Sequence, residues 1–302
     1  MGVISGGSGG GGGGAVILRV NGLSGTSISA TLGSKTVSGT IPYAGVLELN
    51  LGKVGQWAVT ARSGSYSFTQ QVKAFTYGIT EIWALAKKAF YDCTTTEIQA
   101  IAKSGMYKQY WSIGDYHKIT MKDGEEIEVA IADFNHDVTP GGVTIPVTLL
   151  MKNCFKATHV MNNSNTNVGG WTNSNLRTST LPSILSNFPD EWQNIMITAQ
   201  KKTAQGDNSA TIVTSDDKAW LLSQIELTGA NSQSYAGEGT LYPIFTDNAS
   251  RIKRVNNVAN NYWTRSPAAS NNQDFCLVTA VGTLEHVIAG YTQGICLGFC
   301  VG

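Results

Sequence analysis

The stretch that decides the fold is Tyr262-Trp263-Thr264-Arg265-Ser266-Pro267-Ala268-Ala269-Ser270-Asn271-Asn272-Gln273-Asp274-Phe275-Cys276-Leu277-Val278. A similar pattern returns in Gly294-Ile295-Cys296-Leu297-Gly298-Phe299-Cys300-Val301. Short apolar runs that are broken by Gly and Asn are typical of antiparallel strands joined by turns. We therefore predict a frame of paired strands that holds exposed side chains in fixed positions.

Arg265 carries the one charge in the apolar part of this stretch. A buried guanidinium needs a carboxylate or several carbonyl groups, because an unpaired buried charge costs several kcal/mol. Asp216, Asp217 and Glu238 are the candidate partners. We predict a structural salt bridge that fixes the neighbouring loop, with direct ligand binding by Arg265 as the alternative. Trp263 is predicted to lie in the core, with a sugar-stacking role as its alternative.

The sequence resembles a known protein family in several motifs. Trp263-x-Arg265-Ser266-Pro267, the Asn/Ser-rich loop, Phe275-Cys276 and Gly298-Phe299-Cys300-Val301 are similar to C-type-lectin-like domains of phage and prophage tail proteins from Gram-positive bacteria. Further matching motifs are Val168-Gly169-Gly170-Trp171, Ser174-x-Leu176-Arg177, Asp216-x-Lys218-x-Trp220-Leu221-Leu222-Ser223 and Gly237-Glu238-Gly239-Thr240. The resemblance covers about residues 110–302. It implies an α+β, C-type-lectin-like domain that is related to diversified receptor-binding tips.

In that family the segment after the Trp-x-Arg motif varies around a constant scaffold, and the local pattern here has the same division. We predict that the ligand-binding residues are Ala268, Ser270, Asn271, Asn272, Gln273, Asp274, Thr279, Val281, Thr283, Glu285, His286, Ile288 and Tyr291. The frame is predicted to consist of Phe275, Cys276, Leu277, Cys296, Phe299 and Cys300. A rigid backbone favours binding because it lowers the ordering cost of association.

Composition limits the classes of protein to which the chain can belong. It has 302 residues, which is enough for two or three domains, and 42% of them are hydrophobic. Only 14% are charged, with 21 basic and 21 acidic residues. A nucleic-acid partner is not expected, because binding phosphates needs a basic surface. We expect a soluble chain without a membrane span or a signal peptide, since no sufficiently long apolar run is present.

The first part of the sequence predicts a separate domain. Residues 1–14 contain a Gly-rich segment, interpreted as a flexible linker, native or introduced, or as a tether to a larger fibre. Residues 15–78 alternate with a period of two between Gly and Ser turns, which predicts a small β-sandwich. The motif Gly55-x-Trp57-x-Val59-x-Ala61 resembles immunoglobulin-like spacers of tail proteins. This segment has no His or Cys, so we expect no catalysis there.

Residues 79–109 are predicted to form a helical linker. Ile82, Leu85, Ala86 and Ala89 share one face at helical spacing, and a second helix is expected between Thr94 and Gly105. In the terminal domain, 110–302, we predict strands over 119–121, 127–134 and 143–151 and helices over 174–185 and 190–195. The Asn-rich run 162–167 is predicted to be a surface loop because it is too polar for a core.

Metal and redox chemistry is not expected. The five cysteines, an odd number, cannot all pair within one chain, and most lie in apolar contexts that favour buried free thiols. The fold family has distant relatives among copper-dependent formylglycine-generating oxidases, but Cys296 and Cys300 would lie about 13 Å apart on one strand. Asp133-Phe134-Asn135-His136-Asp137 begins like a calcium loop, yet the loop glycine and the closing glutamate are missing. A turn is the preferred interpretation.

We expect no enzyme and no cofactor, since Gly-x-Ser-x-Gly and the cysteine-protease signatures are absent. The preferred function is a tail-fibre or baseplate tip protein of a phage or prophage that binds a bacterial surface glycan or protein. Such a chain is made in the bacterial cytoplasm and acts in the virion tail, with other tail subunits as partners. A homotrimer is expected by analogy. The alternative is a structural or capping tail protein that uses the same surface for subunit packing.

Overall fold

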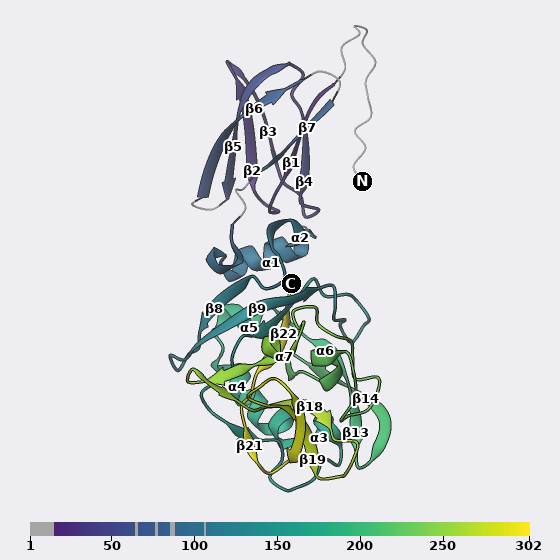
Figure 1. Cartoon of the computed structure of the whole chain (residues 1–302). Helices are drawn as coiled ribbons and strands as arrows, with labels where there is room; N and C mark the ends of the chain where they lie inside the picture. Colours follow the sequence, from purple (N-terminus) through teal and green to yellow (C-terminus); the bar gives the residue numbers. More distant parts are fainter. Residues whose placement is uncertain (1–14, 64–65, 76–77, 85–87, 106) are drawn as a thin grey trace. The chain divides into compact units, whose positions relative to one another are not determined.

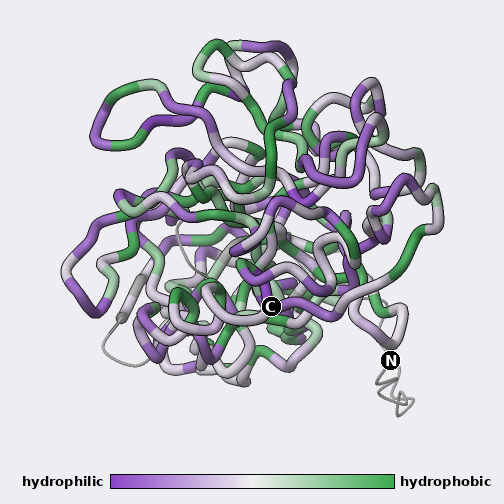
Figure 2. The backbone as a smooth tube through the Cα atoms, turned by 90° about the horizontal axis from the view of Figure 1, so that it is seen from below, coloured by the Kyte–Doolittle hydropathy of each residue, from purple (hydrophilic) through white to green (hydrophobic). Residues whose placement is uncertain are grey.

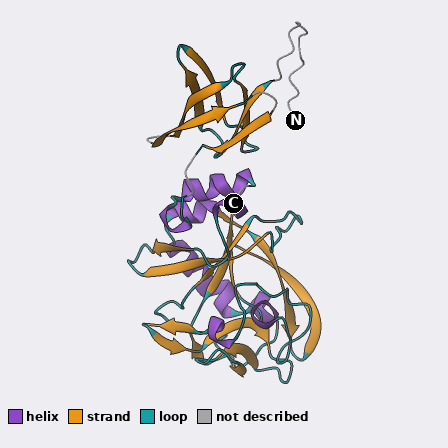
Figure 3. Cartoon of the chain, turned by 45° about the horizontal axis from the view of Figure 1, so that its top comes forward, coloured by secondary structure: helices purple, strands orange, loops and turns teal. Residues whose placement is uncertain are grey.

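The computed structural model describes residues 15–63, 66–75, 78–84, 88–105 and 107–302. The protein is a mixed α+β chain, built mostly of strands in several small sheets with a few short helices (Figures 1 and 3). It divides into two compact units, Met1–Lys88 and Ala89–Gly302. The α+β class expected from the sequence is confirmed at this level.

The first unit contains two small sheets. Its strands are β1 (Val16–Asn21), β2 (Ser27–Leu32), β3 (Lys35–Thr40), β4 (Val46–Asn50), β5 (Gly55–Ser63), β6 (Tyr66–Ala74) and β7 (Gly78–Trp83). One sheet has the order β3-β2-β5-β6 and the other the order β4-β1-β7. Alternate residues of β1 and β5, such as Leu18 and Trp57, are buried in a core to which both sheets contribute. This alternation is the period-two pattern of the sequence.

Strand β7 corrects the helix predicted for the segment after residue 78. Gly78–Trp83 pairs in parallel with β1, and Ile82 packs against the core of the first unit. Leu85 and Ala86, which the predicted helix would include, lie outside the described residues. The helix prediction was wrong because the segment completes a sheet with β1. Its backbone groups are therefore paired with a strand that lies far away in sequence.

A short helical segment opens the second unit. It contains η1 (Phe90–Asp92), α1 (Thr95–Ser104) and α2 (Tyr107–Tyr110). Helix α1 begins with a capping box between Thr94 and Glu97 and ends at Gly105, which adopts a left-handed conformation with φ 77°. The prediction of this helix from its capping signals is confirmed.

The second unit is built on a six-stranded sheet. Its strands are β8 (Tyr116–Thr120), β9 (Glu126–Phe134), β10 (Val147–Met151), β12 (Met196–Ile197), β15 (Ala219–Leu221) and β22 (Leu297–Val301). They follow the order β12-β22-β10-β9-β8, and β15 also pairs with β22. All five residues of both β10 and β22 are buried. The predicted strand 127–134 coincides with most of β9, whereas β10 begins four residues later than predicted.

Helices and two-stranded ribbons surround this sheet. The helical elements are α3 (Gly170–Asn173), the π-helical turn η2 (Leu176–Thr180), α4 (Leu181–Asn187), α5 (Asp190–Ile195), α6 (Gln224–Thr228) and α7 (Asn248–Arg251). The predicted helix 190–195 is confirmed as α5. The predicted helix 174–185 is divided between η2 and α4, and the Ser174 hydroxyl accepts a hydrogen bond from the backbone N–H of Arg177.

Four further sheets complete the described part of the second unit. Two-stranded ribbons are formed by β13 (Ala199–Gly206) with β14 (Ser209–Asp217), β16 (Lys253–Val255) with β17 (Val258–Asn260), and β11 (His159–Val160) with β21 (Thr292–Gln293). A three-stranded sheet has the order β18 (Tyr262–Pro267), β19 (Asp274–Val278) and β20 (Leu284–Ile288). Strands β18 and β19 lie at the end of the unit away from α1 and the C-terminus (Figure 1).

Candidate functional site

Most of the predicted ligand-binding residues lie on the three-stranded sheet and its loops. Those that are exposed are Ser270, Asn272, Gln273, Val281, Thr283, Glu285 and Tyr291. Partly exposed are Asn271, Asp274, Thr279, His286 and Ile288. Figure 2 shows the protein from below relative to the view of Figure 1, with hydrophilic stretches in the loops at the periphery. We call the exposed and partly exposed residues within 270–291 the recognition surface, after the role predicted for them from the sequence.

Ala268 corrects the predicted set, because its side chain is fully buried. Its backbone N–H donates to the carbonyl of Asp274 at 3.0 Å and closes the base of the loop between β18 and β19. Ala268 therefore belongs to the frame. Phe275, Cys276 and Leu277, which were predicted for the frame, are buried as expected.

Asn167 fixes the loop between β18 and β19 through hydrogen bonds from its side chain. Its side chain is fully buried, and its Nδ2 donates to the carbonyls of Asn271 and Asp274, both at 2.9 Å. Its Oδ1 accepts the N–H of Asp207 at 2.8 Å. The prediction that the whole Asn-rich run 162–167 is exposed is thus wrong. A buried amide is satisfied here because backbone groups of two other segments surround it.

A second set of hydrogen bonds fixes the loop from within. Asn271 Oδ1 accepts the N–H groups of Gln273 and Asp274, each at 2.8 Å. His286 Nδ1 lies 2.6 Å from Asp274 Oδ2, and His286 Nε2 lies 3.5 Å from the Ser270 hydroxyl. The atoms follow the order of a serine-hydrolase triad. The outer contact is at the limit of a hydrogen bond, so we interpret the series as support for the loop.

The turn between β19 and β20 is fixed in a similar way. The hydroxyls of Thr279 and Thr283 are 2.7 Å apart, and the N–H of Gly282 donates to the Thr279 carbonyl. Gly282 has φ 80°, and a Cβ at this position would lie 1.9 Å from the carbonyl oxygen of Asn248. Only glycine fits there without a shift of the backbone. The turn presents Val281, whose exposed fraction is 66%.

Arg265, on strand β18 of this sheet, is completely buried, as is Trp263. Its guanidinium forms a bidentate ion pair with Glu226, with Nη1 to Oε2 at 2.5 Å and Nη2 to Oε1 at 2.9 Å. The remaining contacts are to the carbonyls of Lys202, Leu221 and Glu238 and to the Thr203 hydroxyl. The carboxylate partner predicted from the sequence was wrong. Asp217 pairs with Arg177 instead, and Glu238 contributes its backbone carbonyl.

The ion pair continues into a buried charge cluster. Lys201 Nζ lies 2.7 Å from Glu226 Oε1 and 2.6 Å from Asp137 Oδ1. Tyr242 and Thr148 donate their hydroxyls to Asp137 Oδ2. Burial opposes ionisation of Asp137, but the charge and hydrogen bond of Lys201 and the hydrogen bond from Thr148 together outweigh burial and lower the pKa of Asp137 to about 2. Two carboxylates are thus balanced by two cations.

Glu238 is the third carboxylate of this region. Burial raises the pKa of Glu238 above its ordinary value, which favours the protonated form. Its Oε1 accepts the N–H of Ala204 at 2.9 Å, and Oε2 forms a hydrogen bond with the Ser266 hydroxyl. In its protonated form Glu238 adds no charge to the cluster. A cavity of about 200 Å³ leads to Lys201, Glu226 and Arg265 from the surface at His136 and Thr240.

The segment weighed as a calcium loop has other contacts. Asp133 Oδ2 pairs with His136 Nδ1 at 2.8 Å, while Asp137 belongs to the charge cluster. Asn135 turns the chain with φ 61°. Across the residues that the structure describes, no group of three or more His, Cys, Asp or Glu side chains could hold a metal ion.

All five cysteines are buried, and Cys154, Cys276, Cys296 and Cys300 are free, as predicted for cysteines in apolar contexts. Burial raises the pKa of the thiols of Cys154, Cys276, Cys296 and Cys300, so each is held as an unreactive neutral thiol.

None of the helices in the described part of the chain is long and apolar enough to cross a membrane.

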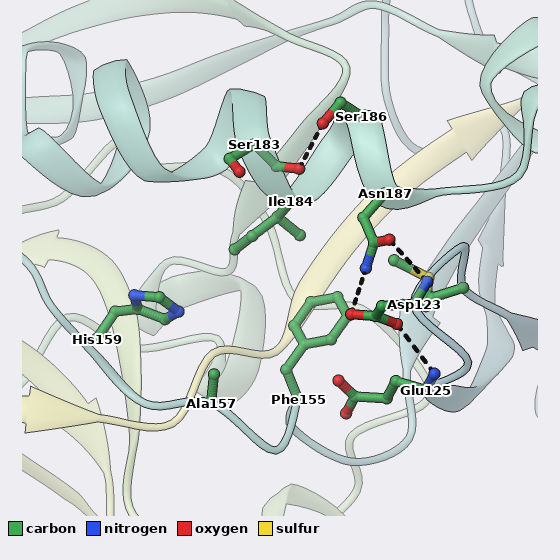
Figure 4. Close-up of a pocket in the computed structure, with 10 residues that line it drawn as sticks. Asp123, Glu125, Phe155, Ala157, His159, Ser183, Ile184, Ser186 and Asn187 are labelled. Atoms are coloured by element: carbon green, nitrogen blue, oxygen red, sulfur yellow. Dashed lines mark hydrogen bonds between the residues drawn. The ribbon is translucent and has the colours of Figure 1, made fainter.

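A cleft of about 420 Å³ lies elsewhere on the second unit (Figure 4). Three segments line it: the turn between β8 and β9, the segment that leads into β11, and helix α4. The lining residues are Met121, Asp123, Glu125, Phe155, Ala157, His159, Ser183, Ile184, Ser186 and Asn187. Reasoning from the sequence missed this cleft, because no single motif contains its residues.

Sequence reasoning also missed Glu226, Lys201 and Asn167. Ser223-x-x-Glu226 is a capping-box pattern, and the capping box is present at α6. That local signal predicts the helix. It does not reveal that the same carboxylate also binds Arg265 and Lys201, which come from β18 and β13.

Comparisons with known proteins assign the second unit to a family. Residues 146–301 match the family described as a domain of unknown function, DUF6273. No curated protein and no solved structure matches the chain. The matched region runs from the start of β10 to the end of β22 and includes the recognition surface and the Arg265, Glu226 and Lys201 side chains of the charge cluster, whereas Asp137 lies before it. Because the match spans just over half of the chain, the protein belongs to the DUF6273 family.

Proposed function

We propose that this protein is a recognition module at the tip of a phage or prophage tail fibre or baseplate. It binds a bacterial surface glycan or protein through the recognition surface, residues 270–291. In this proposal the second unit is a C-type-lectin-like domain and the first an immunoglobulin-like spacer. The chain is made in the bacterial cytoplasm, joins other tail subunits as a homotrimer and acts in the virion.

The observation that carries the proposal is a contrast between side chains and backbone. The exposed polar side chains of Asn272 and Gln273 lie on a loop whose backbone is fixed by Asn167 and Asn271, and that of Glu285 lies on strand β20. The turn that leads into β20 is fixed by Thr279. A fixed backbone lowers the entropy lost on binding. Exposed side chains that make few internal contacts can change without unfolding the unit. This combination suits a surface that recognises ligands.

Position in the unit also supports the proposal. The chain enters the second unit at Ala89, near α1, whereas β18 and β19 lie at the opposite end (Figure 1). A module attached through its entry end would present the recognition surface outward.

The alternative, a structural or capping tail protein, uses the same surface for subunit packing. It is favoured by two exposed apolar side chains, Val281 and Tyr291, with exposed fractions of 66% and 55%. Replacing both by Ser should dissociate an assembly that packs through them. A change in oligomeric mass, measured by light scattering, would support the packing role.

Adsorption to cells tests the main proposal. Purified, fluorescently labelled protein should bind cells of a susceptible Gram-positive host and reduce phage adsorption to them. An unrelated protein of similar charge serves as the control. Binding to no host cell together with no effect on adsorption would overturn the proposal and leave the packing role.

A further inference from the structure

The cleft of Figure 4 combines a fixed polar wall with an apolar patch. Asp123 and Asn187 form the wall through two hydrogen bonds, Asp123 N–H to Asn187 Oδ1 at 3.1 Å and Asn187 Nδ2 to Asp123 Oδ2 at 2.7 Å. Asp123 Oδ1 accepts the N–H of Glu125 at 3.0 Å. These bonds lower the pKa of Asp123 and tie the β8–β9 turn to the end of α4. The wall is therefore preformed.

The apolar patch lies between this wall and His159. Figure 4 shows Ile184 projecting from α4 toward Phe155, with Ala157 nearby and His159 on the side away from Asp123. Phe155 is buried, Ile184 is partly exposed and Ala157 is exposed. A ligand with an apolar face can lie on this patch while its edges reach polar groups at both sides.

Several polar groups of the cleft have no partner among the described residues. They are the two ring nitrogens of His159, Oε2 of Glu125 and the hydroxyl of Ser183. Glu125 Oε1 is already occupied by the N–H of Lys156 at 2.8 Å. Burial lowers the pKa of His159, which favours the neutral ring with one donor and one acceptor nitrogen. The cleft thus offers both donors and acceptors.

We propose that this cleft binds an uncharged saccharide of one or two rings. Hydroxyl groups both donate and accept, which matches the mixed set of Glu125, His159 and Ser183. The C–H face of a sugar ring matches the apolar patch. The volume, about 420 Å³, lies within the range of ligand pockets, roughly 300–1,000 Å³. The carboxylates of Asp123 and Glu125 disfavour an anionic sugar by repulsion.

This site is separate from the recognition surface and does not rest on the proposed tail function. Its residues come from 121–125, 155–159 and 183–187, none of which belongs to residues 270–291. Saccharide binding in the cleft and cell binding through the recognition surface can therefore be lost independently.

Amide NMR spectra of the full chain test the proposal. The probes are glucose, galactose, rhamnose, N-acetylglucosamine and the β1,4-linked disaccharide of N-acetylglucosamine, at millimolar concentrations. At least one should shift amide signals of residues 121–125, 155–159 and 183–187. No shift with any probe, or shifts confined to other residues, would overturn the proposal.

Two variants and a matched control make this test specific. Ala157→Trp fills the cleft and should weaken binding at least about tenfold. Thr158→Trp adds the same ring at the next exposed position, outside the cleft lining, and should bind as the native chain does. Glu125→Gln keeps the shape but removes the charge, and should also weaken binding. Equal affinity of Ala157→Trp and the native chain, with a native-like spectrum, would contradict the assignment.

Discussion

Arg265 and Glu226 form a bidentate ion pair in which neither side chain reaches solvent. Their exposed fractions are 0% and 1%, and the two N···O distances are 2.5 and 2.9 Å. Glu226 also caps α6 and binds Lys201. One carboxylate therefore connects β18, which leads into the recognition surface, with α6 and β13.

Removal of the Glu226 carboxylate should destabilise the protein strongly. Glu226→Gln leaves Arg265 and Lys201 without their shared counter-ion, and breaking a buried pair costs about 3–5 kcal/mol. Burial opposes the ionisation of Glu226, but Arg265 and Lys201 together hold its pKa below the ordinary value, which agrees with a charged native state. The free energy of unfolding in urea measures the effect.

Glu128→Gln is the matched control for that variant. Glu128 pairs with Lys152 at 2.8 Å, but the two side chains are 32% and 40% exposed. Exposed pairs contribute about 0–1 kcal/mol. Equal losses of unfolding free energy in the two variants would show that the buried pair contributes no more to stability than the exposed pair.

Glu238 should make stability depend on pH. Its pKa is raised by burial in the folded chain, so the native state retains a proton that the unfolded chain releases above its own pKa. The stabilisation from this proton is complete below the unfolded pKa and is lost as pH rises through the folded value. Glu238→Gln resembles the protonated form and can keep the bonds to Ala204 and Ser266.

We therefore expect the stability of the Glu238→Gln variant to increase relative to that of the native chain as pH rises. The difference in unfolding free energy should grow by up to about 1.4 kcal/mol per pH unit from about pH 4.5 until the folded pKa is reached. Urea unfolding at several pH values between 4.5 and 8 checks this. A difference that stays constant over the range would mean that Glu238 titrates normally.

The first unit should fold alone only when β7 is included. The fragment 15–88 contains β7, which pairs with β1 and contributes Ile82 to the core, whereas the fragment 15–77 lacks it. Amide NMR spectra should be dispersed for 15–88 and poorly dispersed for 15–77. Equally well dispersed spectra would show that β7 is dispensable and that the boundary predicted near residue 78 is adequate.

Local signals in the sequence predicted local structure well. The capping box at Thr94 and the left-handed Gly105 bounded α1, and α5 coincides with the helix predicted over residues 190–195. Period-two alternation predicted most of β9. Such signals need only neighbouring residues, so a single sequence contains them.

Features that depend on distant partners were missed. β7 is a strand because β1, about sixty residues earlier, offers it an edge. Glu226 is the partner of Arg265 because α6 and β18 pack together, although Glu238 and Asp217 were equally plausible by composition. Asn167 is buried because Asn271 and Asp274 satisfy it from more than a hundred residues away.

Prediction of the binding residues was limited in the same way, because burial depends on distant contacts. The polar residues between Ser270 and Tyr291 were recognisable as largely exposed, because they alternate with apolar residues that anchor the strands. Ala268 was misplaced: it is buried and its backbone N–H pairs with Asp274, a contact that its own sequence neighbours do not reveal. Asp274 itself is only partly exposed and supports the loop through His286. These contacts leave the exposed side chains as the better targets for a test of recognition.

The most direct test of the central claim removes those side chains together. The variant combines Asn272→Ala, Gln273→Ala, Glu285→Ala and Tyr291→Ala. All four are exposed, so the free energy of unfolding should change by no more than about 2 kcal/mol in total. The control variant replaces four exposed residues of α2, β8 and β9 by Ala: Lys108, Gln109, Thr120 and Glu126.

Flow cytometry with labelled protein measures the binding of both variants and the native chain to host cells. We predict that the recognition variant loses at least about tenfold in affinity, while the control variant binds as the native chain does. Equal binding by all three proteins, with the recognition variant folded, would contradict the claim that residues 270–291 recognise the host.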